Sequence, residues 1–345
     1  MTDPVIACED LWMVFGGGAR RALTTAQGPG RAPRDIASAL ADDGLIPAVR
    51  GVSFEVGAGE LFVVMGLSGS GKSTVIRCLS RLIEPTAGAV RIDGEDILSA
   101  RPARMTRLRR EKMGMVFQHF GLFPHMTVAE NVSYPLKVQG TARDARQARA
   151  AEVIELVGLA GREDAFPREL SGGQRQRVGI ARSLAVNPEI WFLDEPFSAL
   201  DPLIRRQLQD EFLRLQSDLQ KSIVFITHDI AEALKLADRI AIMRDGEIVQ
   251  IGTPAEIVLS PADSYVAEFA RDIPRGQMMK VAALMEPANG VDPAAPALHP
   301  GMTLDAALAS FVPHLGAVPV TDGDGKLVGQ VTPEALVRAL GAESA

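Results

Sequence analysis

Apolar residues along the chain alternate between short runs and longer segments with helical spacing. The short runs are rich in β-branched and aromatic residues and predict strands; they are VSFEV (52–56), LFVVM (61–65), IWFLD (190–194), IVFITH (223–228) and RIAIM (239–243). A longer segment, LIRRQLQDEFLRLQSDL, follows Pro202 and repeats its apolar positions with the period of a helix. Strands that alternate with helices are typical of an α/β protein with a mostly parallel sheet, so the pattern predicts this fold class.

Two stretches interrupt the pattern. Residues 19–47 are rich in Gly, Pro, Arg and Ala and predict a surface insertion, either ordered or mobile, with a weak helical stretch at RDIASALADDG. Near residue 273 the periodicity fades, and ANGVDPAAPALHPG then repeats proline and glycine as no helix or central strand tolerates. We therefore expect a first domain at 1–272, a linker at 273–277 and a smaller domain at 278–345.

Composition narrows the class of protein. The 345 residues carry a net charge of −7, which argues against nucleic acid as a partner, and the basic run RPARMTRLRREK is interpreted as a solvated helix face. Cys8 and Cys78 alone suggest neither a disulfide framework nor a metal site and fit a reducing cytosol. The apolar runs fall short of about 18 residues, and the N-terminus lacks the basic residues of a signal peptide. We expect that the chain itself does not cross a membrane.

A phosphate-binding loop is predicted at GLSGSGKST (66–74), between the apolar strand LFVVM and the helical segment TVIRCLSRLI. Gly66, Gly69 and Gly71 allow backbone N–H groups to turn inward around a β-phosphate. Lys72 is placed to reach the β- and γ-phosphates, and Ser73 to offer its hydroxyl to Mg²⁺. The alternative, a glycine turn with a chance lysine, does not explain the surrounding strand and helix.

Two later strands end in residues suited to hydrolysis. IWFLDEP places Asp194 and Glu195 at the end of a buried strand, where Asp194 would hold Mg²⁺ and Glu195 would polarise the attacking water. His228 directly follows another apolar strand and is expected to contact the γ-phosphate. The alternatives are an acidic pair that faces solvent and a structural histidine.

A second glycine-rich cradle, SGGQ (171–174), precedes the amphipathic run RQRVGIARSLAV and so lies at a predicted helix N-terminus. One site cannot use both cradles on the same γ-phosphate. The sequence therefore favours two copies arranged head to tail, each phosphate loop facing the other copy's SGGQ. A helix cap that only looks suited to an anion is the alternative.

These motifs, with VFQHFGLFPHMTVAENV, FSALD and ITHD, resemble the nucleotide-binding subunit of an ATP-binding-cassette (ABC) transporter over residues 5–270. The resemblance implies a helical subdomain at about 120–185, with ATP and Mg²⁺ as cofactors. It assigns the nucleotide contacts of the phosphate loop to Gly66, Leu67, Ser68, Gly69, Ser70, Gly71, Lys72, Ser73 and Thr74. It assigns the clasp on the partner's ATP to Ser171, Gly172, Gly173 and Gln174.

The resemblance also implies roles for residues outside these loops. Gln118 would touch Mg²⁺ and water and lead into the surface that grips the membrane partner. Phe15 would stack on adenine. Asp201 ends FSALD, the loop that links the two ATP sites. Gln118 and residues 120–131 are expected to form the groove for a permease helix, with the apolar pair Leu122 and Phe123 exposed in it; packing of this pair in the core is the alternative.

A narrower set of motifs, including SRLIEPTAG and FSALDPLIRRQLQDE, is similar to the ATPase subunits of glycine betaine/proline betaine importers. The C-terminal TLDAALASF and VTPEALVRAL segments resemble a single small α+β CBS module. The resemblance implies a homodimer bound to integral membrane permease subunits at the cytoplasmic face of the inner membrane, with a substrate-binding protein as an indirect partner. An importer for another small solute, a soluble ABC ATPase acting on nucleic acid or ribosomes, and a cassette degenerated into a regulatory module are the alternatives.

Overall fold

The computed structural model describes residues 3–28, 30–117, 121–198, 200–271, 273, 276, 279–289, 291, 296–311 and 316–341. The chain forms two compact units, Met1–Thr253 and Pro254–Ala345. Two short helices, α10 (Pro254–Leu259) and α11 (Ser264–Ala270), fall in the second unit, so the first unit ends before the boundary expected near residue 273. Across the described ranges, none of the helices has the length and apolar character needed to span a bilayer.

The larger sheet of the first unit has six strands in the order β10-β9-β3-β8-β7-β6. Its strands are β3 (Leu61–Met65), β6 (Met113–Val116), β7 (Ile190–Asp194), β8 (Ser222–Thr227), β9 (Arg239–Arg244) and β10 (Glu247–Gly252). All neighbours pair in parallel except β9 and β10, which form an antiparallel hairpin. The mostly parallel sheet confirms the predicted α/β class.

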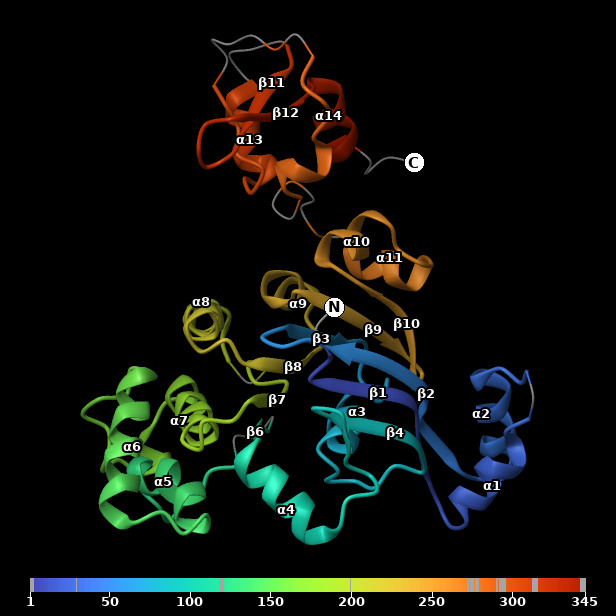
Figure 1. Ribbon diagram of the computed structural model, residues 1–345, viewed down its shortest axis with the longest axis vertical. Helices are drawn as coiled ribbons and strands as arrows, with labels where there is room; N and C mark the ends of the chain where they lie inside the picture. The colour runs from blue at the N-terminus through green and yellow to red at the C-terminus, as the bar shows by residue number, and fades with distance from the viewer. Residues whose placement is uncertain are drawn as a thin grey trace. The chain divides into compact units, whose positions relative to one another are not determined.

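A second, antiparallel sheet has the order β2-β1-β4-β5. Its strands are β1 (Ile6–Phe15), β2 (Ile46–Val56), β4 (Ala87–Ile92) and β5 (Glu95–Asp96). Helix α3 (Lys72–Leu79) contacts strands of both sheets and shares one apolar core with them, as its place in Figure 1 suggests. The helix that follows the phosphate loop is therefore held from two sides.

Helices α5 (Val128–Val138), α6 (Arg143–Leu156) and α7 (Gly172–Leu184) pack on one another as a group of their own (Figure 1), within the range expected for the helical subdomain. The short 3₁₀ helix η1 (Pro167–Glu169) precedes α7. The remaining helices are α4 (Pro102–Glu111), α8 (Pro202–Leu219) and α9 (Ile230–Leu236). Helix α4 carries the basic run and buries only Met105 and Leu108, which confirms that most of its charges face solvent.

The insertion at 19–47 forms two helices, α1 (Ala19–Ala26) and α2 (Pro33–Asp42). Leu23, Ile36 and Leu40 are buried in a small apolar cluster with Trp12 of β1. The weak helical stretch is confirmed as α2, whereas α1, which begins after Gly18 without a side-chain cap, was not expected. Burial of these side chains is the reason the insertion has regular structure.

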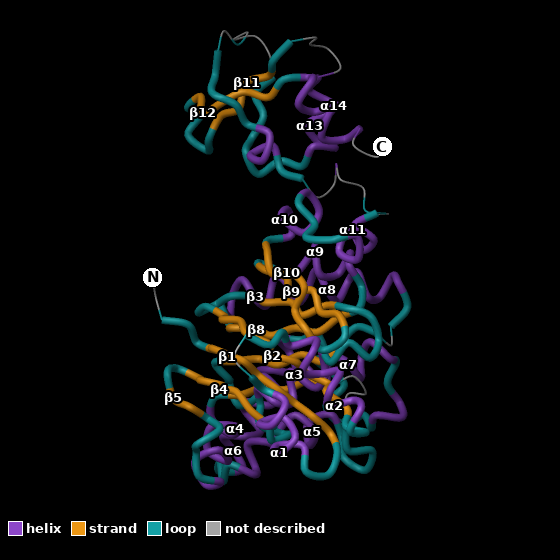
Figure 2. Tube along the Cα trace, turned by 90° about the vertical axis from the view of Figure 1, so that its right-hand side faces the viewer, coloured by secondary structure: helices purple, strands orange, loops and turns teal. Residues whose placement is uncertain are grey.

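The second unit has its own apolar core, which includes Val281, Leu298, Val320 and Leu336. Beyond α10 and α11, its described elements are η2 (Val281–Leu284), α13 (Leu304–Phe311), β11 (Val318–Thr321), β12 (Leu327–Val331) and α14 (Pro333–Gly341). Strands β11 and β12 pair in antiparallel orientation, and Figure 2 shows them beside α13 and α14. This is the small α+β module expected from the C-terminal sequence.

Candidate functional site

The predicted phosphate loop connects β3 to α3, and its backbone path requires glycine at two positions. Gly66 has φ of 156°, and a Cβ there would lie 2.3 Å from the carbonyl oxygen of Met243. Gly71, at the start of α3, has φ of 98°, and a Cβ would lie 2.4 Å from the carbonyl oxygen of Ala48. The loop is thus pressed against β9 and β2, with its amide groups at the N-terminus of a helix, where anions bind.

Lys72 lies within the loop rather than extended into solvent. Its side chain is 5% exposed, and Nζ donates hydrogen bonds to the carbonyl oxygens of Gly66 at 2.8 Å and Leu67 at 2.9 Å. Burial lowers the pKa of Lys72, while the carboxylates of Glu195 and Asp194 act in the opposite direction. The ammonium group is therefore held where it can meet phosphate oxygens.

Ser73 and Asp194 meet although 121 residues separate them. Ser73 Oγ donates to Asp194 Oδ1 at 2.8 Å, and Arg77 Nη2 lies 3.9 Å from Asp194 Oδ2. Burial raises the pKa of Asp194, and the Ser73 hydrogen bond and the Arg77 charge oppose that shift. A hydroxyl and a carboxylate side by side are the hard oxygen ligands that Mg²⁺ prefers, so the residues present fit the predicted ion.

Glu195 and His228 form a pair at the ends of β7 and β8. His228 Nδ1 lies 3.1 Å from Glu195 Oε2. Glu195 has φ of 45°, an uncommon value for a residue with a side chain, and its N–H donates to the carbonyl oxygen of Ile226 at 3.1 Å. Strained backbone of this kind clusters at functional sites, which agrees with the predicted role of the carboxylate.

The structure brings the loop and this pair together around one cleft of about 610 Å³. The cleft is lined by Ala48, Ser68, Gly69, Gly71, Lys72, Ser73, Thr74, Glu195, Ser198 and His228. Sequence reasoning missed Ala48, which no motif marks, and Ser198, which lies inside the FSALD segment without a role of its own. Of the other predicted loop residues, Leu67 is 58% exposed and Ser70 is buried.

The predicted second cradle lies at the N-terminus of α7. Ser171 Oγ accepts a hydrogen bond from the N–H of Gln174 at 3.2 Å, and Gln174 Oε1 accepts one from the N–H of Ser171 at 2.9 Å. Among the described residues, Ser171, Gly172, Gly173 and Gln174 are not part of the lining of the cleft of their own chain. Their role toward a second copy stays a prediction.

Two of the other predicted residues, Phe15 and Asp201, are not part of the lining. Phe15 ends β1, is 39% exposed and pairs with Ile46 of β2, two residues before Ala48 of the cleft lining, so its contact with adenine stays a prediction. Asp201 caps α8 by accepting a hydrogen bond from the N–H of Ile204 at 3.1 Å. Gln118 lies outside the described residues.

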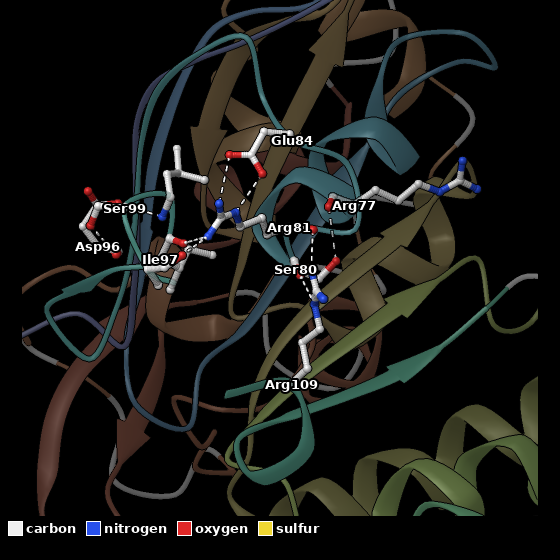
Figure 3. Close-up of polar contacts among 10 residues, drawn as sticks. Arg77, Ser80, Arg81, Glu84, Asp96, Ile97, Ser99 and Arg109 are labelled. Atoms are coloured by element: carbon white, nitrogen blue, oxygen red, sulfur yellow. Dashed lines mark hydrogen bonds and ion pairs between the residues drawn. The ribbon is translucent and has the colours of Figure 1, made fainter. Parts of the chain in front are cut away.

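The end of α3 opposite the phosphate loop is anchored by two arginines (Figure 3). Arg81 forms an ion pair with Glu84 and donates to the carbonyl oxygens of Ile97 and Ala100, both at 2.7 Å. Arg109 of α4 donates to the carbonyl oxygen of Ser80 at 3.1 Å and to that of Arg81. Arg109 thus satisfies the carbonyl groups directly after the helix, which suits the negative end of the helix dipole, whereas Arg81 ties this end to the segment before α4.

Comparison with known proteins bears on this site. A family model described as ABC transporter matches residues 49–198, and one described as CBS domain matches residues 291–342. The trimethylamine N-oxide transport system ATP-binding protein TmoW of Pelagibacter ubique (strain HTCC1062) is 52% identical over 340 residues, which cover 99% of this chain and 98% of that protein.

Two further relatives extend the comparison. The glycine betaine/carnitine transport ATP-binding protein GbuA of Listeria monocytogenes serotype 1/2a (strain 10403S) is 48% identical over 280 residues, 81% of this chain and 70% of its own. The dimeric post-hydrolysis state of the ATP-binding cassette MJ0796, bound to ADP and Pi, is similar in structure with a TM-score of 0.60 and 31% identity, covering 72% of this chain and 98% of that chain.

Proposed function

The chain belongs to the ATP-binding subunits of ABC transporters, in the group that serves importers of betaine-type solutes, and on that premise we propose that it powers the uptake of a small trimethylated amine. The observation that carries the catalytic part of the proposal is the Glu195–His228 pair, 3.1 Å apart, on the wall of the cleft that also contains Lys72. The fold implies that ATP occupies this cleft.

The proposed roles follow from the contacts of each side chain. Lys72 binds the β- and γ-phosphates. Ser73 and Asp194 would hold Mg²⁺, which would neutralise charge on the phosphate oxygens. Glu195 orients and polarises the attacking water, and His228 contacts the γ-phosphate while its ring holds the carboxylate in place. Most of the rate enhancement in such a site comes from positioning and charge stabilisation.

We propose that two copies enclose ATP between the phosphate loop of one and the SGGQ segment of the other. Ser171, the exposed N-cap residue of α7, supports this arrangement, because it does not line the cleft of its own chain. The dimeric state of the similar cassette bound to ADP and Pi agrees with it. ATP binding then draws the copies together, and hydrolysis releases them.

The proposed contact with an integral membrane permease lies just before α5. Asn131 is fully buried and holds this loop, with Oδ1 accepting from the N–H of Phe123 at 2.8 Å and Nδ2 donating to the carbonyl oxygens of Phe123 and Met126. The loop presents Leu122 and Phe123 half-buried at the surface. A rigid apolar loop of this kind suits a permease helix, which would place the chain peripherally on the cytoplasmic face of the membrane, with a substrate-binding protein as an indirect partner.

The solute proposed is trimethylamine N-oxide. The sequence motifs favoured glycine betaine or proline betaine, but the similarity to the trimethylamine N-oxide protein extends over 99% of the chain, against 81% for the betaine/carnitine protein. Trimethylamine N-oxide and glycine betaine both carry a trimethylated nitrogen and a nearby anionic oxygen, so one transporter group can be adapted to either.

Uptake of labelled trimethylamine N-oxide tests the proposal. Cells that express the chain together with its permease and substrate-binding protein should accumulate the label, and unlabelled trimethylamine N-oxide should compete more strongly than glycine betaine. Cells with the Glu195→Gln chain provide the control without hydrolysis. Stronger competition by glycine betaine would refute the choice of solute, and equal uptake with Glu195→Gln would refute the catalytic role.

A further inference from the structure

A second, much smaller cavity lies behind the Glu195–His228 pair, on the side toward α8 and α9. Its volume is about 10 Å³, and its lining includes Glu195, His228, Arg205 and Glu232. One water molecule needs roughly 10–15 Å³ of such space and two to four polar partners. The cavity therefore has the size of a single water molecule and walls that can bind one.

Arg205 of α8 has a hydrogen-bond donor for which the described residues provide no acceptor. Its Nη1 lies 3.2 Å from Asp229 Oδ2, and its Nη2 donates to the carbonyl oxygen of Leu200 at 3.2 Å. Its Nε is buried and, within the described part of the chain, has no hydrogen-bond partner. A buried donor without a partner loses its bond to solvent and gains nothing in return, so a water molecule at this position is favoured.

Glu232 of α9 supplies an acceptor. Its side chain is 5% exposed, and Oε1 accepts a hydrogen bond from Gln209 Nε2 at 2.9 Å. A carboxylate has about four acceptor positions, so it can also accept from a water molecule in the cavity it lines. Burial raises the pKa of Glu232, although hydrogen bonds from Thr227 and Gln209 oppose the shift.

The position of Arg205 gives this cavity a consequence for catalysis. Its guanidinium joins Leu200, in the FSALD segment (197–201), to Asp229, which directly follows His228. The FSALD segment begins two residues after Glu195, and Ser198 Oγ donates to the Glu195 carbonyl oxygen at 3.0 Å. Arg205 thus connects the two backbone segments that carry the two members of the pair.

We propose that the cavity binds one water molecule between Arg205 Nε and the carboxylate of Glu232, and that Arg205 with this water positions the Glu195–His228 pair relative to the FSALD segment. Arg205 is a positioning residue, because it acts through the backbone of the segments that carry the pair. The proposal rests on the proposed catalytic roles of Glu195 and His228. It adds a water site and a residue that no nucleotide motif contains.

The water site is tested first on the unmodified protein. A crystal structure of the full chain, at a resolution that shows ordered water, should contain one water molecule within hydrogen-bond distance of Arg205 Nε and a Glu232 carboxylate oxygen. A cavity filled by a side chain, or without density for a water molecule, would overturn the proposal. This measurement does not depend on the folding of any variant.

The positioning role is tested with Arg205→Met, which keeps an unbranched side chain as far as the position of Nε and removes the guanidinium with all its donors. The matched control is Arg206→Met, because Arg206 is the exposed neighbour on the same helix. We expect kcat for ATP hydrolysis to fall about tenfold or more in Arg205→Met, because a misplacement of reacting groups by about 1 Å can lower the rate by about a hundredfold. ATP affinity should remain within about twofold, because the phosphate loop is untouched, and Arg206→Met should match the wild type.

If thermal denaturation shows that both variants are folded, an equal kcat in Arg205→Met and Arg206→Met would refute the positioning role. A parallel loss of ATP affinity and kcat in Arg205→Met would show a general structural defect and would also refute it. Glu195→Gln, measured alongside, separates this outcome from failure of the proposed function. If that variant hydrolyses ATP normally, the catalytic assignment itself is wrong.

Discussion

Replacing Gly71 with alanine tests how the backbone path of the phosphate loop sets ATP affinity. The added Cβ would lie 2.4 Å from the carbonyl oxygen of Ala48, whereas ordinary contacts lie at 3.4–4 Å. The loop or β2 must therefore move by about 1 Å. With φ of 98° at Gly71, the side chain also adds backbone strain of about 1–2 kcal/mol.

The movement displaces N–H groups that are aimed at phosphate. Hydrogen bonds to a charged group contribute about 1.5–3 kcal/mol each, and 1.4 kcal/mol corresponds to a tenfold change in affinity. Loss of one such bond in Gly71→Ala should weaken ATP binding by about ten- to a hundredfold. Equilibrium titration with a fluorescent ATP analogue measures the change.

The matched control is Gly94→Ala, in the exposed turn between β4 and β5. Gly94 has φ of 77°, and an added Cβ there meets no atom within 4 Å. This variant should lose stability in thermal denaturation because of backbone strain, yet bind ATP as the wild type does. Wild-type ATP affinity in Gly71→Ala, or the same loss of affinity in both variants, would refute the reasoning.

Two further predictions concern Glu232 and the second cradle. Burial raises the pKa of Glu232, so just above the ordinary value of 4.5 the folded chain binds more protons than the unfolded chain, and the free energy of unfolding falls as the pH rises. Glu232→Gln lacks this contribution, so its free energy of unfolding should fall less steeply with pH than that of the wild type. Urea titrations at several pH values measure both curves, and the same dependence on pH in the two proteins would contradict the prediction. A mixed dimer of Lys72→Ala and Gly172→Asp chains should keep one intact ATP site, measured as nucleotide occupancy, and a dimer with none would contradict a cradle that acts on the partner's ATP. Gly172 is preferred to Gly173 because a Cβ at Gly173 would lie 2.8 Å from Ile204, which would disturb α8 as well.

The phosphate loop could be predicted from the sequence because its chemistry is local. A strand, a loop with glycines at fixed positions and a helix are all contiguous, and in the structure Lys72 and Ser73 begin α3 and line the cleft. The ends of β7 and β8 were also predictable, since a buried strand reads as an apolar run and its last residues lie at the sheet edge.

Contacts that join distant segments could not be predicted. The 2.8 Å hydrogen bond from Ser73 to Asp194 depends on the strand order, which places β3 beside β8 and β8 beside β7. The contacts of Arg205 depend on how α8 packs against the loops that follow β7 and β8, and its sequence position shows only a polar residue on a helix. Helix α1 was missed for a similar reason, because burial of Leu23 near Trp12 stabilises it more than its local sequence does.

The most direct test of the account is a comparison of Glu195→Gln with Lys72→Ala in the purified chain, with ATP binding and ATP turnover measured on the same samples. Glu195→Gln should bind ATP as the wild type does and lose at least about a hundredfold in turnover, because it keeps the phosphate cradle and removes the group that polarises the attacking water. Lys72→Ala should lose ATP affinity. Turnover near the wild-type rate in Glu195→Gln, or a loss of ATP affinity equal to that of Lys72→Ala, would contradict the proposed site.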